Sequence, residues 1–313
     1  MRALHSNSRN LIRRVVNLLL KNPHLARANY LRWLHGHCLQ YPEPPLLIYQ
    51  MGKVGSKTIR DSLRSLDIGR RVFHVHFLTP DRIKETEKER RKYLGTEKEH
   101  LLKHVWQYEY LRKLMARGLD GKKWKIITLT REPVGRNIST FFENLDVESR
   151  DDGRRYTIQS DYYDFETVVD IDDLDELVQL FLTRMNHDRP LEFFDEDLKS
   201  VFGIDVYASE FPKSKGYRIY EENHAEVLLI RLEDLNDCAR DAFKEFLDIE
   251  GFTLVTTNVG GAKVYAPLYK RLRETIVLPQ SYVDRMYDSK YTRHFYTQEE
   301  IAGFRARWRV AGS

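Results

Sequence analysis

Three short apolar segments, each bounded by turn residues, constrain the fold of this chain more than any other feature. They are rich in β-branched and aromatic residues, and we interpret them as strands: "LLIYQ" (46–50), "RRVFHVHFL" (70–78) and "WKIITLT" (124–130). Segments with helical spacing follow the first and the third, at 56–66 and 132–145. Strands that alternate with helices favour a parallel sheet with helices on both faces. The sequence therefore predicts an α/β fold whose ligand lies beyond the carboxyl ends of the strands.

The rest of the chain divides at the break "YPEPP" (41–45). We expect a helical N-terminal extension over 1–41 and one main domain over 42–313. Residues 146–165 are polar and predict an irregular, mobile loop, whereas the C-terminal third is predicted to be mostly helical. The other expected elements are a charged helical hairpin or long helix at 81–118, a helix at 170–185, a strand at 226–235 and a helix at 237–248.

Composition limits the class of protein and of ligand. A chain of 313 residues, 42% of them hydrophobic, is long enough for one large α/β domain or two small ones. The net charge of +4 is too small to indicate nucleic acid, but it would suit an anionic small ligand if the basic residues converge on one cleft. Cys38 and Cys238 make neither a disulfide framework nor a zinc site, so we expect two buried thiols in a reducing, cytoplasmic compartment.

The N-terminal stretch "NLIRRVVNLLLKN" (10–22) carries arginines inside a short apolar run. No apolar run in the sequence reaches the length of a membrane span. The stretch therefore predicts an amphipathic helix. We favour packing of this helix on its own domain over weak association with a membrane surface.

The segment "YQMGKVGSKTI" (49–59) predicts a phosphate-binding loop between a strand and a helix. Glycines let the backbone approach a ligand, and the free amides of a helix start attract negative charge. The Walker A pattern fails, because Ser56 and Met51 stand where its two glycines belong. Glu132 is the one acid after the third strand that we weigh as a magnesium ligand. The loop is therefore P-loop-like without matching a nucleotide triphosphatase.

The third strand leads into a second predicted anion site. Arg131 stands at the end of that strand, just before a helix start, and Pro133 fixes the turn. Ser139 lies two turns along the helix, where its hydroxyl can point back toward the same ligand. A surface salt bridge for the arginine and an exposed helical serine are the alternatives to this interpretation.

A histidine pair, His74 and His76, lies on the second predicted strand. Residues two apart on a strand face the same side, so both side chains could reach the crevice at the strand end. A structural pair in the core is one alternative, and a metal site is the other. No third ligand is evident nearby, so zinc is not favoured.

The loop "GKVGSKT" resembles the 5'-phosphosulfate loop of sulfotransferases that use 3'-phosphoadenosine 5'-phosphosulfate (PAPS) as donor. The resemblance implies that Lys53 contacts the donor and acts in catalysis, and that Gly55, Ser56, Lys57 and Thr58 complete the donor site. Lys57 departs from the pattern, because serine or threonine is usual at its position. Its backbone amide can still serve, whereas the usual side-chain contact is lost.

The two other motifs resemble the same superfamily. The separation of Arg131 and Ser139 is that of the arginine and serine that bind the 3'-phosphate of the donor. The stretch "VFHVHFL" resembles the paired-histidine strand of glycan 2-O-sulfotransferases. By that likeness His76 is the catalytic base that removes the acceptor proton, and His74 is its partner. Histidine suits this task because its pKa lies near neutral pH.

Later segments add to the resemblance. "FGIDVY", "LLIRLEDL" and "SKYTRHFYTQEEI" are similar to bacterial sulfotransferase-like proteins labelled as capsular polysaccharide synthesis proteins. "NVGGAKVY" (258–265) resembles the late loop that closes over the donor in carbohydrate sulfotransferases, with Lys263 as a contact. A plain surface turn is the alternative. The acceptor is expected to bind against the segments 143–170 and 187–225.

The resemblance implies a PAPS-dependent sulfotransferase that moves a sulfuryl group to a hydroxyl of a glycan or another sugar-containing acceptor. It implies no metal and no nucleic acid partner. Two other functions stay open at this point. One is a P-loop kinase of a small molecule, which a magnesium requirement would favour. The other is a non-catalytic nucleotide-binding component of a polysaccharide assembly system.

Overall fold

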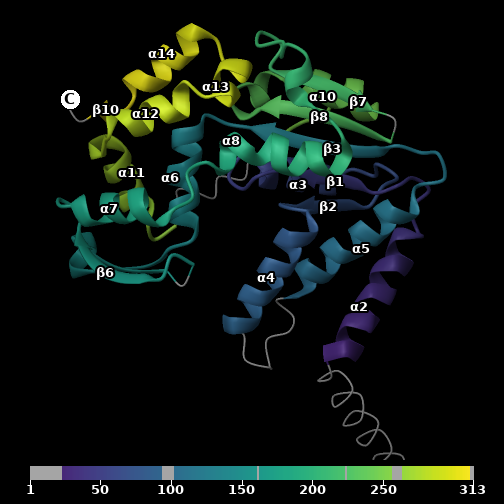
Figure 1. Ribbon diagram of the computed structural model, residues 1–313, viewed down its shortest axis with the longest axis horizontal. Helices are drawn as coiled ribbons and strands as arrows, with labels where there is room; N and C mark the ends of the chain where they lie inside the picture. Colours follow the sequence, from purple (N-terminus) through teal and green to yellow (C-terminus); the bar gives the residue numbers. More distant parts are fainter. Residues whose placement is uncertain (1–22, 94–101, 161, 223, 256–262, 311–313) are drawn as a thin grey trace, which may run out of the picture.

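The computed structural model describes residues 23–93, 102–160, 162–222, 224–255 and 263–310 (Figure 1). In this part of the chain five strands form the central sheet, in the order β2-β1-β3-β8-β7. Their bounds are β1 Leu46–Tyr49, β2 Val72–Val75, β3 Trp124–Thr130, β7 Tyr217–Glu222 and β8 Ala225–Arg231.

The sheet is mixed, so the prediction of a wholly parallel sheet is wrong at one edge. Strand β1 pairs in parallel with β2 and β3, and β3 pairs in parallel with β8. Strand β7 instead runs antiparallel to β8. Only residues 223 and 224 separate these two strands, whereas a parallel connection needs a crossover of about a dozen residues.

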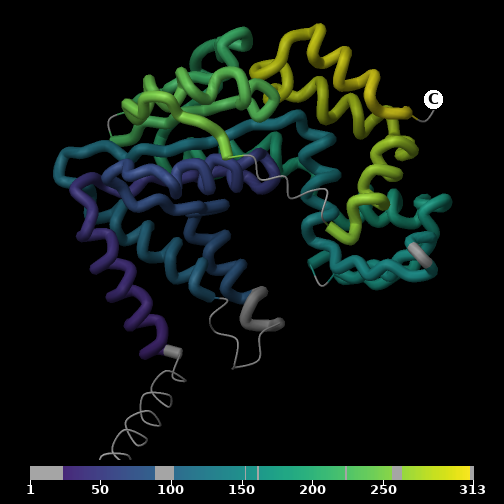
Figure 2. Tube along the Cα trace, turned by 180° about the vertical axis from the view of Figure 1, so that it is seen from behind, coloured from purple at the N-terminus to yellow at the C-terminus, as the bar shows by residue number. Residues whose placement is uncertain are grey.

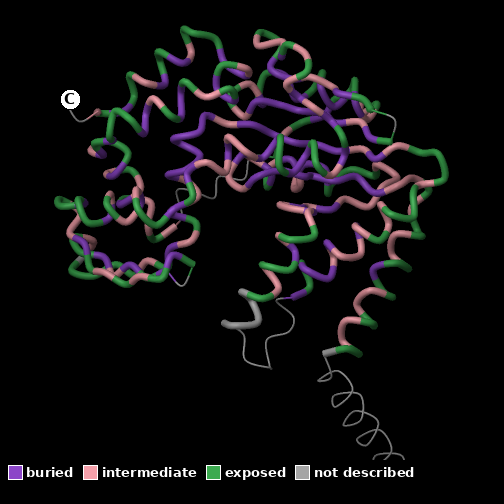
Figure 3. Tube along the Cα trace, viewed as in Figure 1, coloured by how far each residue is buried: buried purple, intermediate pink, exposed green. Residues whose placement is uncertain are grey.

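Helices cover both faces of the sheet, as predicted. Helices α3 (Ser56–Arg64) and α10 (Leu235–Leu247) lie in front of the sheet in Figure 2, and α8 (Arg189–Phe193) lies in front of it in Figure 1. The ammonium of Lys125 in β3 lies 4.6 Å from the centre of the Phe246 ring in α10. The ring of Tyr49, on the opposite face, lies 5.5 Å from that of Phe193 in α8. The strands between these layers are the most deeply buried part of the molecule (Figure 3).

A helical hairpin follows β2, as its charge pattern indicates. It comprises α4 (Pro80–Tyr93) and α5 (Lys103–Arg117). Helix α2 (Pro23–Cys38) packs against α5, where the guanidinium of Arg27 lies 2.6 Å from the Glu109 carboxylate. The predicted amphipathic stretch 10–22 lies outside the described residues. Neither cysteine forms a disulfide: Cys238 is buried as expected, whereas Cys38 is only half-buried.

A small antiparallel sheet replaces the irregular loop that was expected over 146–165. Its strands are β4 Asp146–Arg150, β5 Arg155–Ser160 and β6 Phe165–Asp170. Buried Tyr156 and Ile158 alternate with exposed polar residues along β5, so only one face carries apolar side chains. That alternation is the signal in the sequence that indicates a strand. Helix α7 (Asp175–Arg184) follows within the predicted helical segment.

The C-terminal third is mostly helical, as predicted. Its elements are α11 Ala266–Thr275, β9 Val277–Leu278, α12 Gln280–Tyr287, α13 Lys290–Phe295, α14 Gln298–Ala306 and β10 Arg309–Val310. Between α8 and β7 lie a π-helix at Phe194–Lys199, α9 at Ser200–Phe202 and a 3₁₀ turn at Val206–Ala208. Two further 3₁₀ turns span Asp151–Gly153 and Leu232–Asp234.

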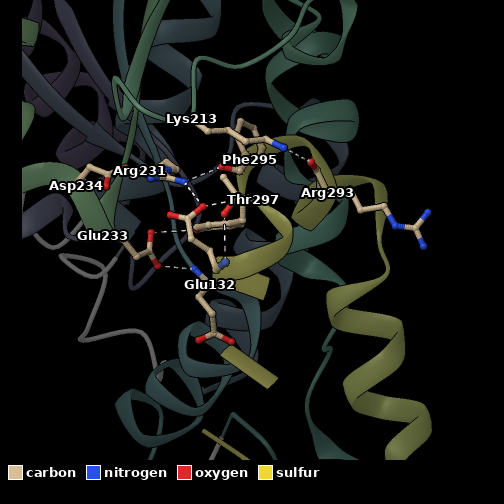
Figure 4. Close-up of polar contacts among 10 residues, drawn as sticks. Glu132, Lys213, Arg231, Glu233, Asp234, Arg293, Phe295 and Thr297 are labelled. Atoms are coloured by element: carbon tan, nitrogen blue, oxygen red, sulfur yellow. Dashed lines mark hydrogen bonds and ion pairs between the residues drawn. The ribbon is translucent and has the colours of Figure 1, made fainter. Parts of the chain in front are cut away.

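A buried arginine at the end of β8 binds the C-terminal helices to the sheet (Figure 4). Arg231 donates to the Phe295 carbonyl at 2.9 Å and to the Glu300 carboxylate at 3.0 Å, and it also pairs with Asp234. Its side chain is only 4% exposed. Each of these contacts joins the carboxyl end of β8 to a segment that follows it in the chain.

We predict that Arg231→Met destabilises the chain strongly. The change removes the guanidinium from two carboxylates and one carbonyl, which should lower the free energy of unfolding by about 2–4 kcal/mol. Urea unfolding followed by circular dichroism measures this loss. Arg240→Met, on the exposed side of α10, is the matched control and should change stability by less than about 0.5 kcal/mol. Equal stability of the two variants would contradict the prediction.

Candidate functional site

The loop between β1 and α3 has the geometry of an anion site. Lys53 and Gly55 adopt positive φ angles of 69° and 94°. Gly55 is the N-cap of α3, and no side chain caps this helix start. A Cβ atom at Gly55 would lie 2.6 Å from a methyl group of Leu232, and a residue with a side chain would be strained at this φ, so the position favours glycine. The first residues of the helix are buried Ser56, exposed Lys57 and half-buried Thr58.

Two arginines hold this loop from the neighbouring strand and helix. Arg131, just after β3, donates through Nη1 to the Lys53 carbonyl at 2.9 Å. Arg136, in α6 (Pro133–Glu143), donates through Nε to the Gly52 carbonyl at 3.1 Å. The carbonyl oxygens of Gly52 and Lys53 thus accept hydrogen bonds from the protein itself. This arrangement leaves the amides of the loop to face a ligand.

Glu132, the acid weighed as a magnesium ligand, is the N-cap of α6. Its carboxylate accepts hydrogen bonds from the amides of Val134 (2.9 Å) and Gly135 (2.7 Å), and from the hydroxyl of Tyr287. The side chain is buried at 6% exposure. These contacts make Glu132 a structural cap and leave it poorly placed for a metal. The described residues contain no group of three or more His, Cys, Asp or Glu side chains that could hold a metal ion.

Two of the predicted lysines meet at a carboxylate that sequence reasoning missed. The Glu143 carboxylate lies 3.0 Å from the Lys53 ammonium and 2.5 Å from the Lys263 ammonium. Burial favours the neutral acid, but the hydrogen bonds from Lys263 and Lys53 outweigh it and lower the pKa of Glu143. Glu143 lies four residues after Ser139 on the same helix, so the 3.6-residue period could have placed it beside this site.

Arg131 and Ser139 lie on one side of α6. A Cβ atom at Gly135 would lie 3.8 Å from Nη2 of Arg131, which places the guanidinium beside the first turn of the helix. Ser139 follows Gly135 by four residues, one turn further along the same side. Ser139 is half-buried. The structure therefore places Arg131 beside the face of α6 that carries Ser139. No hydrogen bond joins the side chains of these two described residues.

The histidine pair lies at the end of β2, and its rings are 4.5 Å apart in a T-shaped arrangement. Strand β2 ends at Val75, so His74 lies on the strand and His76 just beyond it. The Nδ1 atom of His76 lies 3.1 Å from the Gln50 carbonyl. Burial lowers the pKa of His76, and burial together with the neighbouring His76 lowers that of His74 to about 3. Both imidazoles are therefore held in the neutral form near neutral pH.

The two histidines open onto different cavities, so the expectation that both reach one crevice is wrong. His76 lines a cleft of about 760 Å³ together with Met51 and Gly52 of the loop. His74 lines a separate cavity of about 610 Å³ beside β2. The two rings are in contact, as expected for side chains on one side of the strand, but each lines a different cavity.

The cleft beside His76 is rich in arginine. Arg136 is 3% exposed and has no carboxylate partner among the described residues; burial, with the nearby Arg189, lowers its pKa to about 10. Arg189 pairs with the fully buried Asp197, and Arg82 lies 2.9 Å from Glu196. The two segments expected to bind the acceptor both contribute to the lining. A buried guanidinium without a counter-charge is costly, so this cleft favours an anionic ligand.

Comparison with known proteins gives one match. Residues 164–297 match a protein family described as "Putative capsular polysaccharide synthesis protein". No curated protein and no solved structure matches the chain. The matched segment covers Arg189, Arg231 and helices α12 and α13, but not the glycine loop, Arg131, His74 or His76. It relates this part of the chain to polysaccharide biosynthesis. No helix in the described part of the chain is long and apolar enough to cross a membrane.

We predict a small, pH-dependent stabilisation by Glu143. A carboxylate whose pKa is lowered on folding stabilises the protein above its unfolded pKa, near 4.5, and this contribution is lost as the pH falls through the folded value. The free energy of unfolding of the wild type at pH 7 should therefore exceed that of Glu143→Gln by no more than about 1 kcal/mol. The gain is small because the side chains of Glu143 and its two lysines are partly exposed. Urea unfolding at pH 7 and at stepwise lower pH measures the difference. Glu148→Gln, an exposed change on β4, should show no such pH dependence.

Proposed function

We propose that this chain is a sulfotransferase that moves a sulfuryl group from PAPS to a hydroxyl of a glycan. The observation that carries the proposal is that His76 lines one cleft with Met51 and Gly52, the loop residues just before Lys53. A base and a phosphosulfate loop must lie close together for this reaction, and Gly52 and His76 are 24 residues apart in the chain. The family match to polysaccharide synthesis supports a glycan as the acceptor.

The donor would bind along the loop and α6. The amides at the start of α3 and the Lys53 ammonium would hold the 5'-phosphosulfate. Arg131 and Ser139 would hold the 3'-phosphate. Lys53 and Lys263 already meet at the Glu143 carboxylate, which shows that both can reach one anion. When PAPS binds, each lysine would leave this carboxylate and contact a phosphosulfate oxygen of PAPS instead.

The reaction would be an in-line displacement at sulfur. The acceptor hydroxyl gives its proton to neutral His76, and its oxygen forms a bond to sulfur. The bond between sulfur and the 5'-phosphate oxygen breaks, and 3'-phosphoadenosine 5'-phosphate leaves. Lys53 and the loop amides would stabilise charge on the equatorial and departing oxygens, so positioning and electrostatics would carry most of the catalysis. The arginines of the cleft suit an acceptor that itself bears negative charge.

The donor assignment predicts a preference for 3'-phosphoadenosine 5'-phosphate over AMP. AMP lacks the phosphate that Arg131 would bind, and a charge-assisted hydrogen bond contributes about 1.5–3 kcal/mol. Isothermal titration calorimetry should show this preference in the wild type and its loss in Arg131→Ala. AMP affinity, measured in both proteins, separates loss of the 3'-phosphate contact from any change in the loop, because Arg131 also donates to the Lys53 carbonyl. Equal affinity of the wild type for the two nucleotides would overturn the donor assignment.

The base assignment predicts that the histidine variants differ. His76→Ala should lower kcat about 10²–10⁴-fold, while His74→Ala should lower it less because His74 does not line the cleft. Since the pKa of His76 is lowered, the acid limb of the wild-type pH–rate profile should fall below pH 6.5. Steady-state sulfation assays across pH measure both effects.

His224→Ala is the matched control for these variants, because this exposed histidine lies outside the cleft. Its kcat should equal that of the wild type, and donor affinity should be unchanged in all three variants. If His76→Ala retains full activity, another group is the base and the proposed mechanism fails.

A further inference from the structure

A second cavity, of about 610 Å³, lies between the edge strand β2, α3 and α5. Its volume is in the range of small-molecule sites. It shares no lining residue with the cleft beside His76. The ionisable residues in its wall other than tyrosine are Arg60, Arg64, Arg70, Arg71, His74, His104 and Asp67.

Arg71 is the cation in this wall that lacks a counter-charge. Its guanidinium carbon lies 5.9 Å from the ring centres of both Trp33 and Phe73, so aromatic faces hold the side chain. No carboxylate of the described residues forms an ion pair with it. Its Nε atom is buried and has no hydrogen-bond partner. A buried donor without an acceptor is destabilising, and such atoms are rare in native proteins.

His74 adds a second orphaned nitrogen in the same wall. Its Nε2 atom is buried and also has no hydrogen-bond partner. Burial keeps this imidazole neutral, so Nε2 is available either to donate or to accept one hydrogen bond. Arg71 and His74 both line the cavity, so two unsatisfied polar side chains lie in one wall.

The other arginines leave the cavity positively charged. Arg70 is held by Glu43 at 3.1 Å and serves the local structure. Arg60 and Arg64 share one carboxylate, that of Asp61, at 3.1 Å and 3.7 Å. One acid therefore serves two bases at this rim. Asp67 is the acid in the wall itself, and no ion pair among the described residues joins it to Arg71. The electrostatics of the wall thus select an anion.

We propose that this cavity is a second binding site, for a small ligand that carries a carboxylate or phosphate group. The Arg71 guanidinium would bind the anion, beside the His74 imidazole that lines the same cavity. The site is separate from the proposed donor loop and does not depend on sulfuryl transfer. The cavity and the cleft adjoin where the two histidine rings are in contact.

Titration calorimetry on the full chain tests the site with two probes, inorganic phosphate and glucuronate. Arg71→Met removes the guanidinium but keeps an apolar stem beside Trp33, and it should weaken the binding of the preferred probe about tenfold or more. Arg117→Met, an exposed change at the end of α5, is the matched control and should bind as the wild type does. The tighter of the two probes identifies the ligand class.

Histidine-selective NMR locates the bound anion. The ring signals of His74 should shift when the probe binds to the wild type and stay unshifted in Arg71→Met. Arg131→Ala should leave this response intact, which separates the second site from the donor loop. Binding that Arg131→Ala abolishes and Arg71→Met preserves would overturn the proposal, as would the absence of saturable binding by either probe. If Arg71→Met fails to fold, Arg60→Met replaces it and should also weaken the binding of the preferred probe.

Discussion

The position of the Tyr291 hydroxyl is the constraint on which the candidate site depends most. This oxygen accepts a hydrogen bond from the Arg131 amide at 3.1 Å, donates to the Arg131 carbonyl at 2.8 Å and contacts the Thr130 hydroxyl. The side chain comes from α13, 160 residues further along the chain. A strand end is ordinarily free to fray, but here both backbone groups of Arg131 are bound. The arginine therefore leaves the sheet in a fixed direction, toward the loop carbonyl of Lys53.

The same strand end receives a second set of contacts. The amide of Glu132 donates to the Glu233 carboxylate at 2.8 Å, and the Tyr296 hydroxyl donates to the other oxygen of that carboxylate at 3.0 Å. The carboxylate of Glu132 then caps α6. The C-terminal helices thus act on the site without lining it, because they set the direction of β3 as it becomes α6. This arrangement explains how the segment that matches the polysaccharide family can matter to residues that lie outside it.

Local pattern was sufficient to predict much of this architecture. Strand β3 is predicted at 124–130 and spans Trp124–Thr130. The prediction is accurate because a short apolar run bounded by polar residues is typical of a buried strand. The glycine loop, Arg131 and Ser139 were likewise predictable, since each lies at a strand end or on the next helix. Strand β7 was missed because its sequence, "YRIYEE", has only two buried positions. The small sheet was missed because polar residues outnumber apolar ones in its three strands, although Tyr156 and Ile158 do alternate along β5.

Long-range contacts account for what the sequence did not reveal. The pairing of Lys53, Glu143 and Lys263 joins three segments. The helical period places Glu143 near Ser139, but it does not bring Lys53 and Lys263 to that carboxylate. The separation of the two histidines into different cavities depends on the end of β2 at Val75, because the chain turns there. Both features follow from packing of distant elements, which propensity and periodicity do not report.

The strand order has a consequence for how the chain acquires this site. In the sheet Trp124 pairs with Ala225, and the difference between these numbers is 101 residues. The entropic cost of closing the loop between such distant parallel strands comes before their pairing stabilises the fold. Topologies of this kind therefore fold slowly. During synthesis, β1, β2 and β3 leave the ribosome long before β8, and until then β3 is an exposed apolar edge that can pair with another chain. The hydrogen bonds of Tyr291 with Arg131, which need a segment that follows β8, are thus made late in folding.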